Sequence, residues 1–141
     1  MKQPKSANPR HVLIVDDDEA VLDMFASILK VAGHRVTSFS HFEDAKSFLA
    51  KEKPDVLISD VRLGAFNGLQ LIVFAKLQHP EMTAIVLTGY DDPVMRMEAA
   101  HAGATYLVKP VDADTLFEAI TPGAVMADDV VRQIPSRPSL R

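Results

Sequence analysis

The sequence predicts an α/β protein with a doubly wound architecture, in which one five-stranded parallel sheet carries helices on both faces. Two observations predict this fold. Short runs of Val, Ile and Leu with little polar alternation recur along the chain, as expected for parallel strands that are covered on both faces. Segments in which apolar residues have helical spacing separate these runs. Five strand–helix units joined by short loops build a parallel sheet through right-handed connections.

Each predicted strand is followed by one predicted helix, and glycine or proline marks most helix ends. The strands are expected at residues 11–15, 36–39, 56–59, 83–87 and 105–108. The first helix stops at Gly33, the second before Pro54, the third covers 67–78, the fourth runs from Asp92 to Gly103, and the fifth begins near Asp112. On the first helix, the apolar residues Val21, Met24, Ile28 and Ala32 recur on one face.

Composition excludes several classes of protein. The formal net charge is −4 and no block of Lys or Arg occurs, which argues against an extended nucleic-acid surface. Because the chain has no cysteine, disulfides, thiolate catalysis and Cys-ligated zinc are impossible. No apolar run is long enough to span a membrane, and none follows the N-terminal lysines as a signal peptide would require. A cytoplasmic protein without membrane contact is expected.

The 141 residues are predicted to form one domain at 10–121, preceded by a disordered arm at 1–9. Pro122 disfavours helix at Thr121, so the fifth helix is expected to end early. Residues 122–141 are expected to form a loose tail or a short extra helix at 125–134.

Charged and hydroxyl side chains follow four of the predicted strands. Asp16 and Asp17 follow the first strand, Asp60 the third, Thr88 the fourth and Lys109 the fifth. Ligands of open parallel sheets bind at the carboxyl ends of the strands. These five side chains are therefore expected at one edge of the sheet.

The chemistry of this set suits phosphoryl transfer. Three close carboxylates repel one another, and a hard cation such as Mg²⁺ relieves the repulsion. Lys109 can neutralise one phosphoryl oxygen while the Thr88 hydroxyl donates to another, and transfer depends mostly on such positioning and charge neutralisation. A carboxylate can act as the nucleophile, and Asp60 is predicted to be that phosphorylated residue.

Each residue has an ordinary structural explanation when considered alone. An Asp run before a helix usually caps the helix, and a single Asp after a strand is most often a turn residue. Only the joint occurrence of these residues at alternating strand ends favours a functional site. The histidines, His11 and His34 among them, have no ligand spacing and are interpreted as structural or solvated.

Five stretches resemble the receiver domain of bacterial two-component response regulators, over residues 10–120. They are VLIVDDDEAV at 12–21, PDVLISDVRL at 54–63, Asn67-Gly68-Leu69, AIVLTGYDD at 84–92 and AGATYLVKPVD at 102–112. The resemblance implies a flavodoxin-like, CheY-like (βα)5 fold. It also implies a switch that catalyses only its own phosphorylation and dephosphorylation, and not a turnover enzyme.

The resemblance implies a role for each residue of the site. Asp60 is the implied phosphoacceptor, and Asp17 is the implied direct ligand of Mg²⁺, or of Mn²⁺ in its place. Asp16 is the implied acidic partner, and the backbone carbonyl of Arg62 completes the protein ligands. Thr88 and Lys109 are implied to contact the phosphoryl group, Tyr106 to turn inward when Thr88 moves, and the bond before Pro110 to be cis.

The implied phosphoryl donor is a sensor histidine kinase or a histidine phosphotransfer protein, and the implied target is an unidentified protein. The resemblance allows a homodimer through the fourth helix, fifth strand and fifth helix. The early end of the fifth helix before Pro122 shortens the surface that such a dimer would use. No output domain fits in the last residues, so the chain is expected to be a stand-alone receiver or part of a longer regulator.

Three other positions bear on the interpretation. Gly64 stands where the family often has Pro, which is expected to loosen that loop. The bulky residues Arg62 and Tyr90 are expected to hinder water and slow the loss of phosphate.

Two alternatives stay open at this point. Asp16-Asp17-Asp18 also resembles the nucleophile motif of haloacid-dehalogenase-type phosphatases, although Ala20 stands where that family usually has Thr or Val. A docking module that works without phosphorylation is the second alternative, and the complete acidic set argues against it.

Overall fold

The computed structural model of the chain describes residues 8–121. The predicted arm lies largely outside this range, and the predicted tail and the helix at 125–134 lie wholly outside it. The chain divides into two compact units, one up to Pro110 and one from Val111. The first unit contains the whole sheet and four helices, and the second contributes one helix to the described residues.

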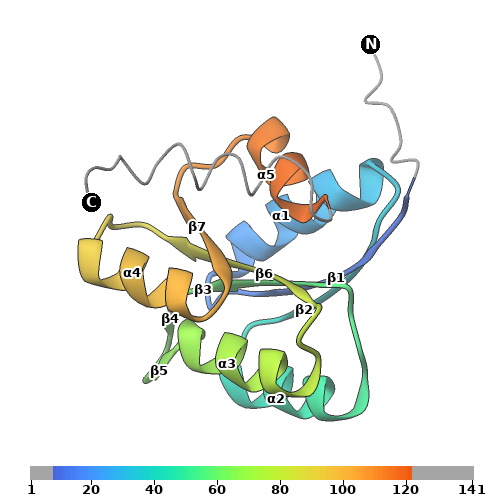
Figure 1. Cartoon of the computed structure of the whole chain (residues 1–141). Helices are drawn as coiled ribbons and strands as arrows, with labels where there is room; N and C mark the ends of the chain where they lie inside the picture. The colour runs from blue at the N-terminus through green and yellow to red at the C-terminus, as the bar shows by residue number, and fades with distance from the viewer. Residues whose placement is uncertain (1–7, 122–141) are drawn as a thin grey trace. The chain divides into compact units, whose positions relative to one another are not determined.

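The first unit is built on a five-stranded parallel sheet, as predicted (Figure 1). Its strands are β1 (His11–Val15), β2 (Arg35–Phe39), β3 (Val56–Asp60), β6 (Thr83–Thr88) and β7 (Ala104–Val108). Their order across the sheet is β2-β1-β3-β6-β7. The chain reverses its direction of progress between β1 and β3, and this switch point is where ligands of such sheets bind.

Helices cover both faces of this sheet. The helices of the first unit are α1 (Glu19–Val31), α2 (Phe42–Lys51), α3 (Gly68–Gln78) and α4 (Pro93–His101). Helix α1 lies on one face, and α2, α3 and α4 lie on the other (Figure 1). Leu13 and Leu57 of the sheet share one buried cluster with Leu49 of α2 and Ile72 of α3. Within residues 8–121, no helix has the length and apolar character that a membrane span requires.

Strand burial follows the position of each strand in the sheet. The inner strands β1, β3 and β6 are buried almost throughout, in agreement with their continuous apolar sequences. The edge strands β2 and β7 are only partly buried, because each has a neighbour on one side alone.

Side-chain caps fix where several helices begin. Asp18, Asn67 and Asp92 accept hydrogen bonds from backbone N–H groups in the first turns of α1, α3 and α4. In the second unit, Asp112 caps α5 (Ala113–Ile120) in the same way, by accepting from the N–H group of Thr115. Thr121 then adopts an extended conformation, as expected for the residue before a proline. The prediction that the fifth helix ends early is confirmed.

The apolar face expected on the first helix is only partly the buried one: Ala32, directly after α1, is buried, and Val21 and Ile28 are half-buried. The buried residues of α1 are Leu22, Phe25 and Leu29, whereas Met24 is 49% exposed. Both sets have helical spacing and both are apolar, so periodicity alone could not choose between the two faces.

A small hairpin between β3 and α3 is a further difference from the prediction. Strands β4 (Arg62–Leu63) and β5 (Phe66–Asn67) pair antiparallel across a two-residue turn. Gly64 has a φ of 63° in this turn, a conformation that favours glycine, and Phe66 stacks on Phe42 of α2 with a ring separation of 4.4 Å. Gly64 therefore serves a defined turn, where the sequence led us to expect a loosened loop.

Candidate functional site

Strand register brings the predicted site residues to one edge of the sheet. Val15 pairs with Ser59, so Asp16 and Asp60 follow at neighbouring positions of β1 and β3. Asp60 in turn pairs with Leu87, directly before Thr88 in β6. Backbone hydrogen bonds continue the alignment beyond the strands, because the Lys109 N–H donates to the Thr88 carbonyl at 2.7 Å.

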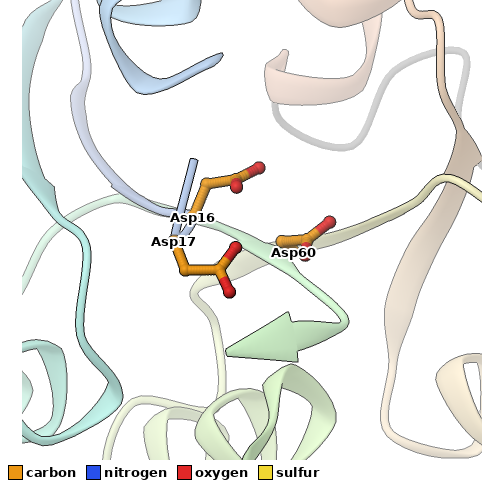
Figure 2. A group of neighbouring side chains, drawn as sticks. All are labelled: Asp16, Asp17 and Asp60. Carbon is orange, nitrogen blue, oxygen red and sulfur yellow. The ribbon is translucent and has the colours of Figure 1, made fainter. Parts of the chain in front are cut away.

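Three carboxylates gather at the ends of β1 and β3 (Figure 2). Asp16, Asp17 and Asp60 each offer a carboxylate oxygen, and these oxygens lie within 4.8 Å of one another. Asp16 and Asp60 are buried, with 2% and 7% of their surface exposed, whereas Asp17 is exposed. The site is therefore a partly buried acidic cluster that remains open to solvent on the side of Asp17.

Lys109 lies across this cluster. Its ammonium nitrogen is 3.0 Å from Asp16 Oδ2 and 2.9 Å from Asp60 Oδ1. The lysine comes from the end of β7, two strands away from β3, so its long side chain spans the end of β6. Backbone groups hold the same carboxylates: the N–H of Arg62 donates to Asp60 Oδ2, and the N–H of Asp18 donates to Asp16 Oδ1.

Burial and neighbouring charges set the proton affinities at this edge. Burial raises the pKa of Asp60, with a further rise from the Asp16 charge, and Lys109 and the Arg62 N–H oppose this shift without cancelling it. Burial alone would lower the pKa of Lys109, but the hydrogen bonds and charges of Asp60 and Asp16 outweigh it and raise that pKa. The cluster thus holds the lysine firmly charged while its own negative charge stays in excess.

The donor set fits a hard divalent cation. Three carboxylates that converge within one ion's reach, beside a single ammonium group, leave negative charge that a cation with oxygen preference can neutralise. The exposed position of Asp17 leaves room for water or for an anionic group at the same ion.

The predicted hydroxyl group is present but is directed at its own loop. Thr88 is buried, and its Oγ1 donates to the Tyr90 carbonyl at 2.9 Å and accepts from the Tyr90 N–H at 3.1 Å. Tyr90 itself is 75% exposed. Thr88 therefore lies at the predicted edge with its proton engaged by the segment that leads into α4.

Tyr106 contacts the other end of that segment. Its hydroxyl accepts from the Asp92 N–H at 2.9 Å and lies 3.2 Å from Asp91 Oδ1, to which it can donate. The inward movement implied for Tyr106 is a prediction about a second state.

The peptide bond between Lys109 and Pro110 is cis, as the resemblance implies.

Sequence reasoning missed the role of Gly68. A Cβ atom at this position would fall far inside van der Waals contact with the Asp60 carbonyl oxygen and 2.6 Å from Ser59 Oγ. The backbone at the start of α3 therefore packs directly against the backbone of the acidic residue. A glycine in the first turn of a predicted helix, where glycine is a poor helix former, was the available signal.

The fold and the site together define a small α/β domain that presents carboxylates, a hydroxyl and an ammonium group at the carboxyl edge of its sheet. The family model described as the response regulator receiver domain matches residues 12–121. The chain belongs to this family, whose members are signalling modules of two-component systems. The match favours the receiver interpretation over the phosphohydrolase alternative.

Individual proteins agree with the family match. The chain is 34% identical over 116 residues to the transcriptional regulatory protein GlrR of Escherichia coli K12, which covers 82% of this chain and 26% of that protein. The chain thus spans about a quarter of the length of this curated relative. It also matches the crystal structure of a response regulator from Burkholderia pseudomallei with a phosphorylated aspartic acid, a calcium ion and citrate (TM-score 0.81, 25% identity, 92% of this chain and 75% of that one). A CheY-like receiver domain from Methanospirillum hungatei JF-1 matches with a TM-score of 0.77 and 28% identity, covering 89% of this chain and 99% of that one.

Proposed function

We propose that this chain is a phosphorylation-driven switch that accepts a phosphoryl group on Asp60 from a histidine kinase or a histidine phosphotransfer protein. The observation that carries the proposal is the position of Lys109, whose ammonium group contacts both Asp60 and Asp16 at 2.9–3.0 Å. The phosphorylated aspartic acid in the Burkholderia protein supports the same chemistry here. The receiver domain is proposed to span residues 10–121.

In the proposed reaction, a carboxylate oxygen of Asp60 attacks the phosphorus atom of phosphohistidine. The new O–P bond forms as the P–N bond breaks, and the bonding electron pair stays on the imidazole nitrogen of the donor. Lys109 neutralises a phosphoryl oxygen and so stabilises the charge that the transition state spreads over these oxygens. The backbone N–H of Arg62 keeps the acceptor carboxylate in place.

A divalent cation is the proposed cofactor. Asp16, Asp17 and Asp60 would hold Mg²⁺ or Mn²⁺, together with the backbone carbonyl of Arg62. When bound, the cation offsets the repulsion between the carboxylates and the incoming phosphoryl group. Asp17 is the proposed direct ligand and Asp16 the acidic partner that also orients Lys109.

The proposed output is a change at the surface that α4 and β7 form. A phosphoryl group on Asp60 adds about −1.5 to −2 charge and strong acceptor atoms. Thr88 would leave its bond to Tyr90 and donate to a phosphoryl oxygen, which frees the space that Tyr106 enters. This is a shift between two packings, so phosphorylation needs to favour one of them by only a few kcal/mol.

The proposed partners are a kinase or phosphotransfer protein on the input side and an unidentified protein or domain on the output side. The GlrR relative is a transcriptional regulatory protein, and this chain matches only about a quarter of it. An output of the same kind, in a protein that contains this receiver, is compatible with that match. Direct nucleic-acid binding by this chain is not part of the proposal, since its charge is acidic.

Incubation with acetyl phosphate and Mg²⁺, followed by intact-mass measurement, tests the proposal. We expect one added phosphoryl group on the wild type, none on Asp60→Asn, and none on the wild type when a chelator removes the cation. Equal addition to both proteins would refute Asp60 as the acceptor. Sustained turnover of a phosphate ester without a phosphorylated protein would favour a phosphohydrolase instead.

A further inference from the structure

Asp91 and Arg96, near the start of α4, form a network with Tyr106 of β7, and the proposed reaction uses neither Asp91 nor Arg96. Arg96 donates to both carboxylate oxygens of Asp91, at 3.0 and 3.1 Å. The Arg96 guanidinium carbon also lies 4.5 Å from the centre of the Tyr106 ring, a cation–π contact. The Tyr106 hydroxyl completes the network through Asp91 Oδ1 and the Asp92 N–H. We name Asp91, Arg96 and Tyr106 the latch.

The latch connects two elements that the proposed switch must move relative to each other. Asp91 and Arg96 belong to the loop after β6 and to α4, whereas Tyr106 belongs to β7. One guanidinium group makes both of the Arg96 contacts: its Nη2 atom donates to the two oxygens of the carboxylate, and the group also lies over the ring. Removal of that one group would therefore loosen two of the three contacts at once.

The latch also bears on Thr88 through the chain between them. Residues 88–92 form one short segment that is fixed at both ends. At one end, the Thr88 hydroxyl is bonded to Tyr90, and at the other, the Asp92 N–H is bonded to Tyr106. Thr88 can donate to a phosphoryl group only when it gives up its bond to the Tyr90 carbonyl, and the latch restrains the segment that would have to move.

We propose that Asp91 and Arg96 are positioning residues that hold Tyr106 against the start of α4 and so oppose the switch. The inference rests on the proposed function, because it concerns regulation of the same site. The second packing is then populated only in molecules in which the latch has opened, with or without phosphate on Asp60. Loss of the latch favours that packing in advance and makes the acceptor site easier to phosphorylate.

The size of the effect is set by how exposed the latch is. The side chains of Arg96 and Asp91 are 45% and 56% exposed, so solvent screens their ion pair. Loss of Arg96 should therefore raise the population of the second packing by about fivefold, and should not populate it fully. Lysine keeps the charge and can reach the Asp91 carboxylate, but it has no planar group to stack on the Tyr106 ring, so Arg96→Lys should preserve only part of the latch.

The chain offers a clean probe of the latch. It contains two tyrosines and no tryptophan, so Tyr90→Phe leaves Tyr106 as the single tyrosine. In this background, NMR of ring-labelled tyrosine reports Tyr106 alone. The variants to compare are Arg96→Gln and Arg96→Lys, with Lys53→Gln as the matched control, because Lys53 forms an exposed ion pair with Glu81. Each is measured without phosphodonor and then with acetyl phosphate and Mg²⁺, whose uptake is followed by intact mass.

The Tyr90→Phe protein with Arg96 intact is the reference. The inference predicts that Arg96→Gln moves the Tyr106 ring resonances toward those of the phosphorylated reference before any phosphodonor is added. It also predicts about fivefold faster phosphorylation, an intermediate Arg96→Lys, and a control that matches the reference in both measurements. The latch alone would be overturned if the Tyr90→Phe protein is phosphorylated and Arg96→Gln in that background has the same rate and the same resonances. A slower rate in Arg96→Gln would overturn it too. No phosphate on the wild type would overturn the proposed function and, with it, the regulatory role of the latch.

Discussion

The two ends of the parallel sheet both carry charged networks, but the balance of charge differs between them. At the amino end, the Asp55 carboxylate accepts from the His11 N–H, and Arg10 donates to the Asp55 carbonyl and to Thr83. His34 accepts from the Arg10 N–H through Nδ1. At the carboxyl end, three carboxylates gather around the one ammonium group of Lys109.

The difference separates a structural network from a functional site. At the amino end, donors and acceptors are matched across neighbouring strands, so the network connects β1, β2, β3 and β6. At the carboxyl end, buried negative charge exceeds what the protein neutralises, which costs stability and suits the proposed binding of a cation and a phosphoryl group. The predictions below test this contrast.

Loss of Lys109 should have the largest effect. In Lys109→Met, the phosphoryl oxygens lose their protein cation, and phosphorylation by acetyl phosphate should slow by about 100-fold. Lys53→Met removes the same charge from an exposed ion pair and should leave the rate unchanged. A Lys109→Met rate within a few-fold of the wild type would show that the lysine contact is structural, like those of the amino end.

Gly68→Ala should have the next largest effect, because the new methyl group would collide with the Asp60 carbonyl and Ser59 Oγ. We expect a loss of about 2 kcal/mol in the free energy of unfolding, measured in urea, together with slower phosphorylation as Asp60 is displaced. Gly89→Ala is the matched control, since its Cβ would meet nothing within 4 Å. Equal stability of both variants would contradict the close packing of α3 on the acceptor strand.

The amino end should respond to acid. Burial and the Arg10 charge lower the pKa of His34 below its ordinary value of 6.5, so the unfolded chain binds this proton more tightly than the folded chain. The stability contributed by neutral His34 is therefore fully present above about pH 6.5. It is lost as the pH falls from there toward the lower pKa of His34 in the folded protein. Protonation at Nδ1 would also break the hydrogen bond from Arg10, worth about 1 kcal/mol.

His34→Asn tests this pH dependence. The asparagine side-chain oxygen can still accept the hydrogen bond from the Arg10 N–H, but the side chain does not titrate. Urea unfolding from about pH 7.5 to about pH 5 should show a smaller loss of stability in His34→Asn than in the wild type. Identical pH slopes in the two proteins would show that the amino-end network does not depend on neutral His34.

Phosphate loss should show the smallest effect. Arg62 and Tyr90 are bulky and exposed, two residues past the acceptor and two past Thr88, and we expect them to hinder the attacking water. Arg62→Asn and Tyr90→Glu should each shorten the half-life of the phosphorylated protein by about threefold, or less than 1 kcal/mol. Half-lives no shorter than that of the wild type would count against this role.

The sequence was sufficient for the fold class and for the gathering of the acidic residues and Lys109 at one edge, because both follow from local patterns. Apolar strands and the residues that follow them placed Asp16, Asp60 and Lys109 at one edge. Contacts between elements were beyond such patterns. The buried face of α1, the backbone contact at Gly68 and the contact of Arg96 with Tyr106 depend on how elements pack, and no periodicity or spacing encodes that packing.

The central claim is that Asp60 itself carries the phosphoryl group, and chemical trapping tests it most directly. Borohydride reduces an aspartyl phosphate to homoserine, so peptide mass mapping after treatment with acetyl phosphate, Mg²⁺ and borohydride identifies the acceptor. The account predicts homoserine at position 60 and unchanged aspartate at Asp16, Asp17 and Asp18. Homoserine at one of those positions, or at none in a protein that has gained phosphate, would contradict it.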